Sequence, residues 1–298
     1  MTTAPSAPSL AGLLGIALPA VAVLDIGARG EGRDRYAPLV AQGLARVTGV
    51  EVLPQDAAAL KARGIVRLIP ALLGAGGPAR FHVTRYPGCS SLLAPDPAVI
   101  DLFPMIGTGP TGNFHVEGIH EIATRRLDDV LVEGLPDFIK IDVQGAELDI
   151  LRHGRRALER ATVLEAEVEF VALYRDQTLF GDLQVFLRDA GFVLHKLIDL
   201  VGHSLMPPEA GYPVSQLLWG DAVFVRDFAR LERYDDDELM RAALVLNDVY
   251  QSYDLVARLL AEHDRRRGTD HAARHRAGLA RHPIPAGSFL NRKPDASA

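Results

Sequence analysis

The chain has 298 residues, of which 48% are hydrophobic, with a formal net charge of −6 and a pI near 5.9. This length and apolar content are enough to bury a full core, as one large α/β domain or as a domain with an appendage. The acidic balance argues against a general nucleic-acid binder. The single cysteine, Cys89, excludes an internal disulfide framework and a cysteine-rich zinc site, and it fits a reducing compartment.

The N-terminal stretch differs from the pattern of a secretory signal. Residues 1–9 are mostly Ala, Pro, Ser and Thr, and we expect residues 1–15 to be flexible. Residues 10–24 are apolar, but no Lys or Arg precedes them, so the positive segment of a signal peptide is missing. Because no stretch of about twenty residues is apolar without interruption, we expect no stable membrane insertion and a cytoplasmic location.

The first predicted strand, Val21–Ile26, runs into the glycine-rich turn Gly27-Ala-Arg-Gly-Glu-Gly32, and a helical segment follows. Such a turn lets backbone N–H groups approach a ligand, and a helix N-terminus favours negative charge. The glycine spacing is G-x-x-G-x-G, whereas the dinucleotide fingerprint is G-x-G-x-x-G. The turn could hold a nucleotide-type cofactor, or it could be a plain structural turn.

Two further strands are predicted at residues 46–53 and 66–73, with a short helix at 57–63 between them. Together with the first strand they form a βαβαβ half. Glu51 lies near the end of the second strand, about 20 residues beyond the glycine turn, where an acid can accept hydrogen bonds from both hydroxyls of a ribose. The sequence therefore predicts a ribose contact at Glu51.

The middle of the chain, residues 81–126, reads as an insert rich in loops. It contains predicted strands at 81–84 and within 114–126, and a short helix at 99–103. Loops of this kind carry much of the variable function of a fold. His115 and His120 lie here, and either could act as a base or be an ordinary surface histidine.

The most informative stretch is Pro136–Leu148, which reads Pro-Asp-Phe-Ile-Lys-Ile-Asp-Val-Gln-Gly-Ala-Glu-Leu. Phe138–Val143 predicts a buried strand, Gly145 a sharp turn, and the residues beyond it a helix. In an open parallel sheet, ligands bind beyond the carboxyl ends of the strands, so Asp142 and Glu147 would face a ligand. Glu147 could instead only complement the helix dipole.

The next predicted strand, residues 162–171, places Glu165, Glu167 and Glu169 on one face. Three like charges in a row are unfavourable unless they are solvated, hydrogen-bonded or opposed by cations. The row could form a polar cleft wall or a solvent-exposed face, and metal binding together with Asp142 is a further alternative. We assign no metal site from the sequence.

The C-terminal third begins with a predicted helix at 179–190. Strands at 192–200 and 217–225 follow without a helix between them, which indicates an antiparallel ribbon. Residues 235–262 show a helical apolar stripe that could pack on the domain or on a second subunit. Residues 265–298 carry eight Lys and Arg against two Asp, and we expect a basic, disordered tail.

Five motifs of the chain occur together in one known family. They are Val23-Leu-Asp-Ile-Gly-Ala-Arg-Gly30, Tyr86-Pro-Gly-Cys-Ser-Ser-Leu92, Asp137-Phe-Ile-Lys-Ile-Asp-Val-Gln-Gly-Ala-Glu147, Val163-Leu-Glu-Ala-Glu-Val-Glu-Phe170 and Trp219-Gly-Asp-Ala-Val-Phe-Val225. Over residues 21–227 the chain resembles the FkbM family of S-adenosylmethionine-dependent methyltransferases. It departs from the family at Arg29, where Asn is common.

The resemblance implies an α/β class I methyltransferase fold. Its Rossmann-like sheet would have seven strands, mostly parallel with the last strand antiparallel, followed by C-terminal helices. The methyltransferase domain would span residues 16–230, and a helical extension residues 231–264. The helices could also mediate a homo-oligomer.

The resemblance also implies S-adenosylmethionine as the cofactor, and places its contacts. The expected cofactor-binding residues are Asp25, Gly27, Arg29 and Gly30 around the amino-acid part, Glu51 on the ribose, Ser91, and Asp142 near the transferable methyl group.

The implied reaction is O-methylation of a hydroxyl on a sugar, glycan or polyketide-type small molecule. Asp142 would be the general base or would orient the acceptor, with His115, Glu147 and Glu167 as weaker candidates. Two alternatives stay open. One is a non-catalytic module for binding or assembly. The other is an NAD(P)-dependent oxidoreductase, which the glycine order and the terminal ribbon disfavour.

Overall fold

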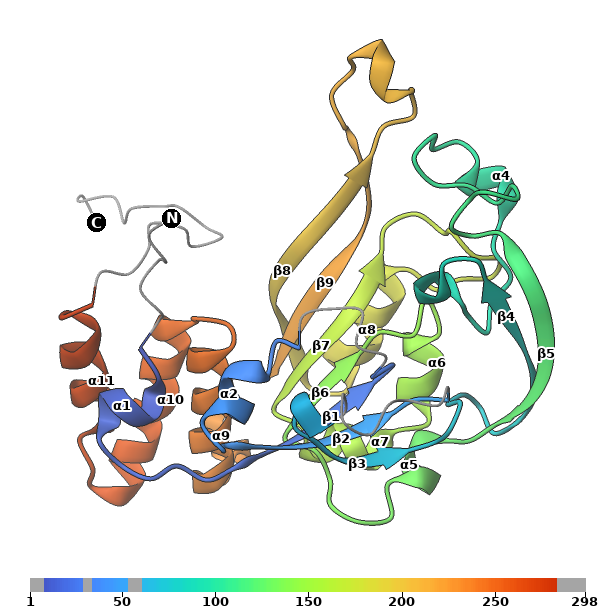
Figure 1. Cartoon of the computed structure of the whole chain (residues 1–298). Helices are drawn as coiled ribbons and strands as arrows, with labels where there is room; N and C mark the ends of the chain where they lie inside the picture. The colour runs from blue at the N-terminus through green and yellow to red at the C-terminus, as the bar shows by residue number, and fades with distance from the viewer. Residues whose placement is uncertain (1–7, 29–33, 53–60, 283–298) are drawn as a thin grey trace.

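The computed structural model describes residues 8–28, 34–52 and 61–282. A central sheet has helices on both faces, and a long β8–β9 hairpin rises from it (Figure 1). The strands are β1 (Val21–Ile26), β2 (Ala45–Val50), β3 (Ile65–Ile69), β4 (Gly77–Thr84), β5 (Val116–Thr124), β6 (Phe138–Ile141), β7 (Val163–Glu169), β8 (Phe192–His203) and β9 (Gln216–Arg226).

The α-helices are shorter in the first half of the chain than in the last third. They are α1 (Leu10–Leu14), α2 (Ala37–Ala41), α4 (Pro97–Ile100), α5 (Leu127–Val130), α6 (Glu147–Arg152), α7 (Arg155–Arg160), α8 (Phe180–Asp189), α9 (Asp236–Asp248), α10 (Tyr253–Arg267) and α11 (His271–Leu279). Single 3₁₀ turns are η1 (Pro87–Cys89), η2 (Pro208–Ala210) and η3 (Leu231–Arg233).

The central sheet has the strand order β3-β2-β1-β6-β7-β9-β8. Strands β3, β2, β1, β6 and β7 are parallel, and β9 runs antiparallel to both β7 and β8. This order confirms the predicted seven-stranded class I sheet with its terminal antiparallel ribbon. Strands β4 and β5 form a separate two-stranded antiparallel sheet. The carboxyl ends of β1, β2 and β6 therefore meet at one edge of the sheet.

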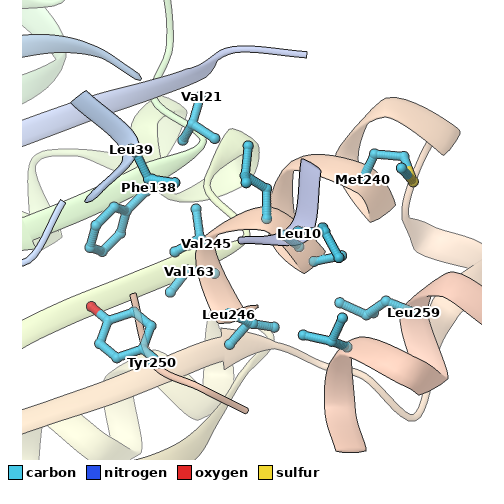
Figure 2. Packing of buried hydrophobic residues seen from close by; sticks show 14 of the residues in the cluster. Leu10, Val21, Leu39, Phe138, Val163, Met240, Val245, Leu246, Tyr250 and Leu259 are labelled. Carbon is cyan, nitrogen blue, oxygen red and sulfur yellow. The ribbon is translucent and has the colours of Figure 1, made fainter. Parts of the chain in front are cut away.

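One face of the sheet is covered by the C-terminal helices and α1. Side chains of β1, β6 and β7, such as Val21, Phe138 and Val163, pack against Val245 and Leu246 of α9 (Figure 2). These residues are fully buried, and each such side chain contributes roughly 1.5–3 kcal/mol. The apolar stripe of the C-terminal helices thus packs on this domain, as the first of the two alternatives predicts, and α9 has no apolar face left for a second subunit.

The opposite face is covered by α5, α6, α7 and α8. Ile139 and Ile141 of β6 and Leu164 of β7 point to this side and pack with Leu148 and Leu151 of α6. Strands β6 and β7 therefore bury apolar side chains on both faces, which is typical of a parallel sheet between two helical layers.

The N-terminus differs from the predicted flexible segment within residues 8–15. Ser9 caps α1 by accepting a hydrogen bond from the Gly12 N–H, and Gly15 ends it in the left-handed conformation. Leu10 is fully buried, and its N–H donates to Asp248 of α9. Among the residues that the structure describes, no helix is long and apolar enough to cross a membrane.

The predicted basic tail also differs from the structure in its first half. Helix α10 continues to Arg267, and α11 packs against α1 and α10. In this stretch His271 and His275 are buried and Arg266 is partly buried, whereas the other arginines of the two helices are exposed. Residues 283–298 lie outside the described residues.

Candidate active site

A cavity of about 290 Å³ lies at the carboxyl ends of β1, β2 and β6. Gly27, Glu51 and Asp142, one from each strand end, contribute to its wall, and Tyr86 and Ser90 of the β4–η1 segment close it on the other side. The volume is near the lower end of the range for small-molecule sites. Three residues predicted from the sequence are thus brought together around one cavity.

Gly27 lies closer to the turn after β6 than any other residue type could. A Cβ atom on residue 27 would lie 1.9 Å from the backbone oxygen of Asp142, and the φ of Gly27 is +82°. The Asp142 N–H donates to the Ile26 carbonyl, so the two strand ends are joined by backbone. Glycine is therefore required here for both reasons, and the turn after β1 is held against the turn after β6.

The turn after β6 is organised by Gln144 and Glu147. Gln144 has a φ of +61°, which is uncommon for a residue with a side chain. The buried Glu147 carboxylate accepts hydrogen bonds from the N–H groups of Val143 and Gly145, at 2.9 and 3.2 Å. Burial raises the pKa of Glu147 to about 7, although these backbone hydrogen bonds oppose the shift. Glu147 fixes the shape of the turn and does not line the cavity.

The Gln144 side chain connects three elements. Its Nε2 donates to Asp142 Oδ1 at 3.2 Å and to the Glu167 carboxylate on β7. Its Oε1 accepts from the hydroxyl of the buried Tyr174 at 3.2 Å. Because the amide has partners on both sides, it holds the Asp142 and Glu167 carboxylates in fixed positions next to the cavity.

Glu165 and Glu169 of the row on β7 are buried and Glu167 is partly buried, so the solvent-exposed alternative is wrong. Glu165 is 1% exposed and Glu169 is 4% exposed. Glu165 accepts from Arg35 at 3.0 Å and from the Tyr250 hydroxyl at 2.6 Å. Burial raises the pKa values of Glu167 and Glu169 well above the ordinary value, and nearby carboxylates add to both shifts. The row is hydrogen-bonded to Arg35, Tyr250 and Gln144, and none of its three side chains lines the cavity.

Lys140 lines the cavity and lies between two acids. Its Nζ is 3.7 Å from Asp142 Oδ2 and 3.9 Å from Asp25 Oδ1. Burial alone would lower the pKa of Lys140, but Asp142 and Asp25 outweigh this effect and raise it. Lys140 therefore stays charged and orients the Asp142 carboxylate, whose side chain is 40% exposed.

Asp25 is only 1% exposed, and two of its charged partners line the cavity. Its Oδ2 accepts from the Tyr36 hydroxyl at 2.7 Å, and Arg63 lies 3.4 Å away. Arg63 also binds the Asp34 carboxylate and donates to the Ala28 carbonyl. This network secures the segments on either side of the glycine turn, so Asp25 acts on the cavity through its neighbours.

The other predicted site residues, Ser91 and His115, do not line the cavity. The Ser91 hydroxyl is buried and donates to the Gln144 carbonyl, while its neighbour Ser90 lines the cavity. His115 lies in the loop before β5, where its Nδ1 is 3.0 Å from the Thr108 carbonyl, and it does not line the cavity. Arg29 and Gly30 lie outside the described residues.

Several residues of the site were missed from the sequence. Lys140 stands within an apolar strand, and a lysine in such a place needs acidic partners, which was a usable signal. Arg35 gave none. Its guanidinium binds Glu165, Asp199 and Asp221, which lie on three different strands, at 2.6–3.0 Å.

Residues 25–194, more than half of the chain, match the Methyltransferase FkbM domain. The chain belongs to this family. The match confirms the predicted resemblance, and with it S-adenosylmethionine as the cofactor of this FkbM methyltransferase domain. No curated protein sequence matches the chain.

Two solved structures are similar to this FkbM domain protein at low identity. One is the magnesium protoporphyrin IX methyltransferase ChlM from Synechocystis PCC 6803 with bound SAM, at 15% identity and a TM-score of 0.35, covering 73% of this chain and 76% of that one. The other is a putative methyltransferase from Thermoplasma acidophilum, at 12% identity and a TM-score of 0.33, covering 72% and 71%. The strand order and the family match, and not these two similarities, carry the assignment.

Proposed function

We propose that the protein transfers a methyl group from S-adenosylmethionine to a hydroxyl oxygen of a sugar, glycan or polyketide-type small molecule. The observation that carries the proposal is the Asp142 carboxylate, which lines the cavity at the end of β6 and is oriented by Lys140 and Gln144. An acid held in this way at a ligand cavity is suited to accept the proton of an alcohol.

The residues around the cavity fit the cofactor. Gly27 lines the cavity at the end of β1, where its backbone would face the amino-acid part of the cofactor. Glu51 at the end of β2 lines the cavity, where its carboxylate would hold the ribose hydroxyls. The bound cofactor supplies an electrophilic methyl group on a sulfonium, so the chemistry needs no redox partner.

The protein's own contribution is to hold and deprotonate the acceptor. Methyl transfer is an in-line displacement, so placing the acceptor oxygen about 3 Å from the methyl carbon supplies much of the rate. Proton removal by Asp142 as the general base would increase the rate by a further factor of roughly 10²–10⁴. Glu167 is the next candidate because it shares Gln144 with Asp142. Glu147 is occupied by backbone N–H groups, and His115 lies away from the cavity.

The test is transfer of labelled methyl from S-adenosylmethionine to a panel of hydroxylated sugars, glycans and polyketide-type alcohols. With the best acceptor, Asp142→Asn should lower kcat by about 10²–10⁴ while the affinity for S-adenosylhomocysteine stays close to native. Asp149→Asn, which changes a half-exposed acid on α6, is the matched control. Full turnover by Asp142→Asn with normal cofactor binding would end the assignment of the base.

Two other functions were considered from the sequence, an NAD(P)-dependent oxidoreductase and a non-catalytic module for binding or assembly. Family membership and the antiparallel β9 do not favour an NAD(P)-dependent oxidoreductase. A non-catalytic module would keep the fold and fail to bind S-adenosylmethionine. The cytoplasmic location stays a prediction that rests on the missing positive segment of a signal peptide and the interrupted apolar stretches, and the single cysteine fits it.

A further inference from the structure

Two histidines and an aspartate converge at the junction of α10 and α11. These two helices belong to the layer that α1 and α9 also form beside the sheet (Figure 1). His263 and Asp264 lie in the last turns of α10, and His271 opens α11. Gly268 ends α10 in the left-handed conformation and reverses the chain, which brings residues eight positions apart together. One nitrogen of each imidazole and one carboxylate oxygen lie within 4.8 Å of one another.

His271 gives the independent observation that these groups form a site. The residue is 8% exposed, and its buried Nδ1 atom has no hydrogen-bond partner among the residues that the structure describes. Its ring lies next to that of His263, with the centroids 5.3 Å apart. A buried imidazole nitrogen normally has a partner, so a bound cation would supply what the fold leaves out.

Asp264 holds the arrangement in place. Its carboxylate accepts hydrogen bonds from the Thr269 hydroxyl and from the N–H groups of His271 and Ala272, the last two at 2.9 Å. A carboxylate has about four acceptor positions, so one remains for a cation. Capping of α11 alone would explain Asp264. It would not explain two converging imidazoles with a buried nitrogen left over.

The positive charges nearby are already paired. Arg265 and Arg266 bind the Glu262 carboxylate at 2.7 Å, and Arg267 binds Asp236 at 3.0 Å. Each of these guanidinium groups thus has an acidic partner, and together they oppose a cation less than three unpaired arginines would.

We propose that His263, Asp264 and His271 bind one divalent transition-metal ion, with Zn²⁺ as the best fit. Two imidazole nitrogens and one carboxylate oxygen are the donors that zinc accepts in a tetrahedral site, whereas Mg²⁺ and Ca²⁺ prefer oxygen ligands alone. Three protein ligands leave one position for water. The ion would join the end of α10 to the start of α11 and stabilise the C-terminal helical layer by binding only the folded state.

The test uses the full chain without an affinity tag, stripped with chelator and titrated with ZnCl₂ by calorimetry. We expect one equivalent to bind and to raise the Tm, and Co²⁺ to give the visible absorption of a tetrahedral nitrogen–oxygen site. His263→Gln and His271→Gln should each weaken Zn²⁺ binding roughly 100-fold or more, because each loses a direct ligand. His120→Gln, on an exposed position of β5, should bind as the native chain does.

Two results would overturn the proposal. One is the absence of stoichiometric Zn²⁺ binding to the folded native chain. The other is equal binding by the native chain and His263→Gln, whose half-buried side chain can be replaced with less risk to folding than that of His271. A tenfold excess of Mg²⁺ should leave the Zn²⁺ isotherm unchanged, and competition by Mg²⁺ would contradict the nitrogen ligands.

Discussion

Gly27 and Asp142 meet at the point where β1 and β6 end, with the backbone of one against the carbonyl oxygen of the other. The turn that we propose to bind the cofactor and the proposed base are thus parts of one backbone junction. Any side chain at position 27 would have to push the turn after β6 away, together with the carboxylate that lines the cavity.

Gly27→Ala should therefore be much more destabilising than the same change at another left-handed glycine. Gly43 has a φ of +70° and nothing within 4 Å of its added Cβ, so Gly43→Ala reports the backbone strain alone, about 1–2 kcal/mol. Gly27→Ala adds overpacking, for a total of roughly 2–5 kcal/mol. Urea denaturation measures both free energies of unfolding. Equal losses for the two variants would mean that the junction is not tight.

Loss of the Gln144 side chain, which is hydrogen-bonded to the Asp142 and Glu167 carboxylates, should reduce turnover more than cofactor binding. Gln144→Ala removes hydrogen bonds to the Asp142 and Glu167 carboxylates, each worth about 1.5–3 kcal/mol, so kcat should fall roughly 10- to 100-fold. Tyr174→Phe removes only the hydrogen bond to the Gln144 oxygen and should have a smaller effect of the same kind. If Gln144→Ala raises KM and leaves kcat unchanged, the side chain binds the acceptor and does not position the base.

The buried Glu147 makes the stability of the fold depend on pH. Burial raises its pKa from 4.5 to about 7, so the native state binds more protons than the unfolded state within this window. The free energy of unfolding should then fall as the pH rises from about 4.5 to 7. Glu167 and Glu169 act in the same direction because burial raises their pKa values too.

Glu147→Gln keeps an oxygen that can accept from Val143 and Gly145 but cannot ionise. Its stability relative to the native chain should increase with pH across the window, by at most about 3 kcal/mol, and the two should be similar near pH 4.5. Urea denaturation at a series of pH values gives this difference. A difference that is constant with pH would show that folding does not raise the pKa of Glu147.

Much of the fold could be predicted from local pattern. The strand β1 matches its predicted bounds, and the strand order confirms the predicted sheet, because apolar runs and turn residues mark these elements directly. Helices α1 and α11 were missed. They are short, and they are stabilised by each other: a Cβ on Gly278 of α11 would lie 2.4 Å from Leu13 of α1. No local pattern reveals a contact between the two ends of a chain.

The candidate site was predictable where it follows strand ends. Gly27, Glu51 and Asp142 end neighbouring strands, and the topology of a parallel sheet brings such positions together. The network around them was not predictable. Lys140 and Gln144 take their roles from partners on other strands, and Glu165 of β7 takes its partners, Arg35 and Tyr250, from segments far away in the sequence.

The central claim is that this cavity binds the cofactor, and calorimetric titration with S-adenosylhomocysteine tests it most directly. We predict micromolar binding to the native chain and roughly 10- to 100-fold weaker binding to Glu51→Ala, which loses the hydrogen bonds to the ribose. Glu133→Ala, at an acid that is 84% exposed, should bind as the native chain does. No binding by a well-folded native chain, or equal binding by Glu51→Ala, would contradict the account of the cavity.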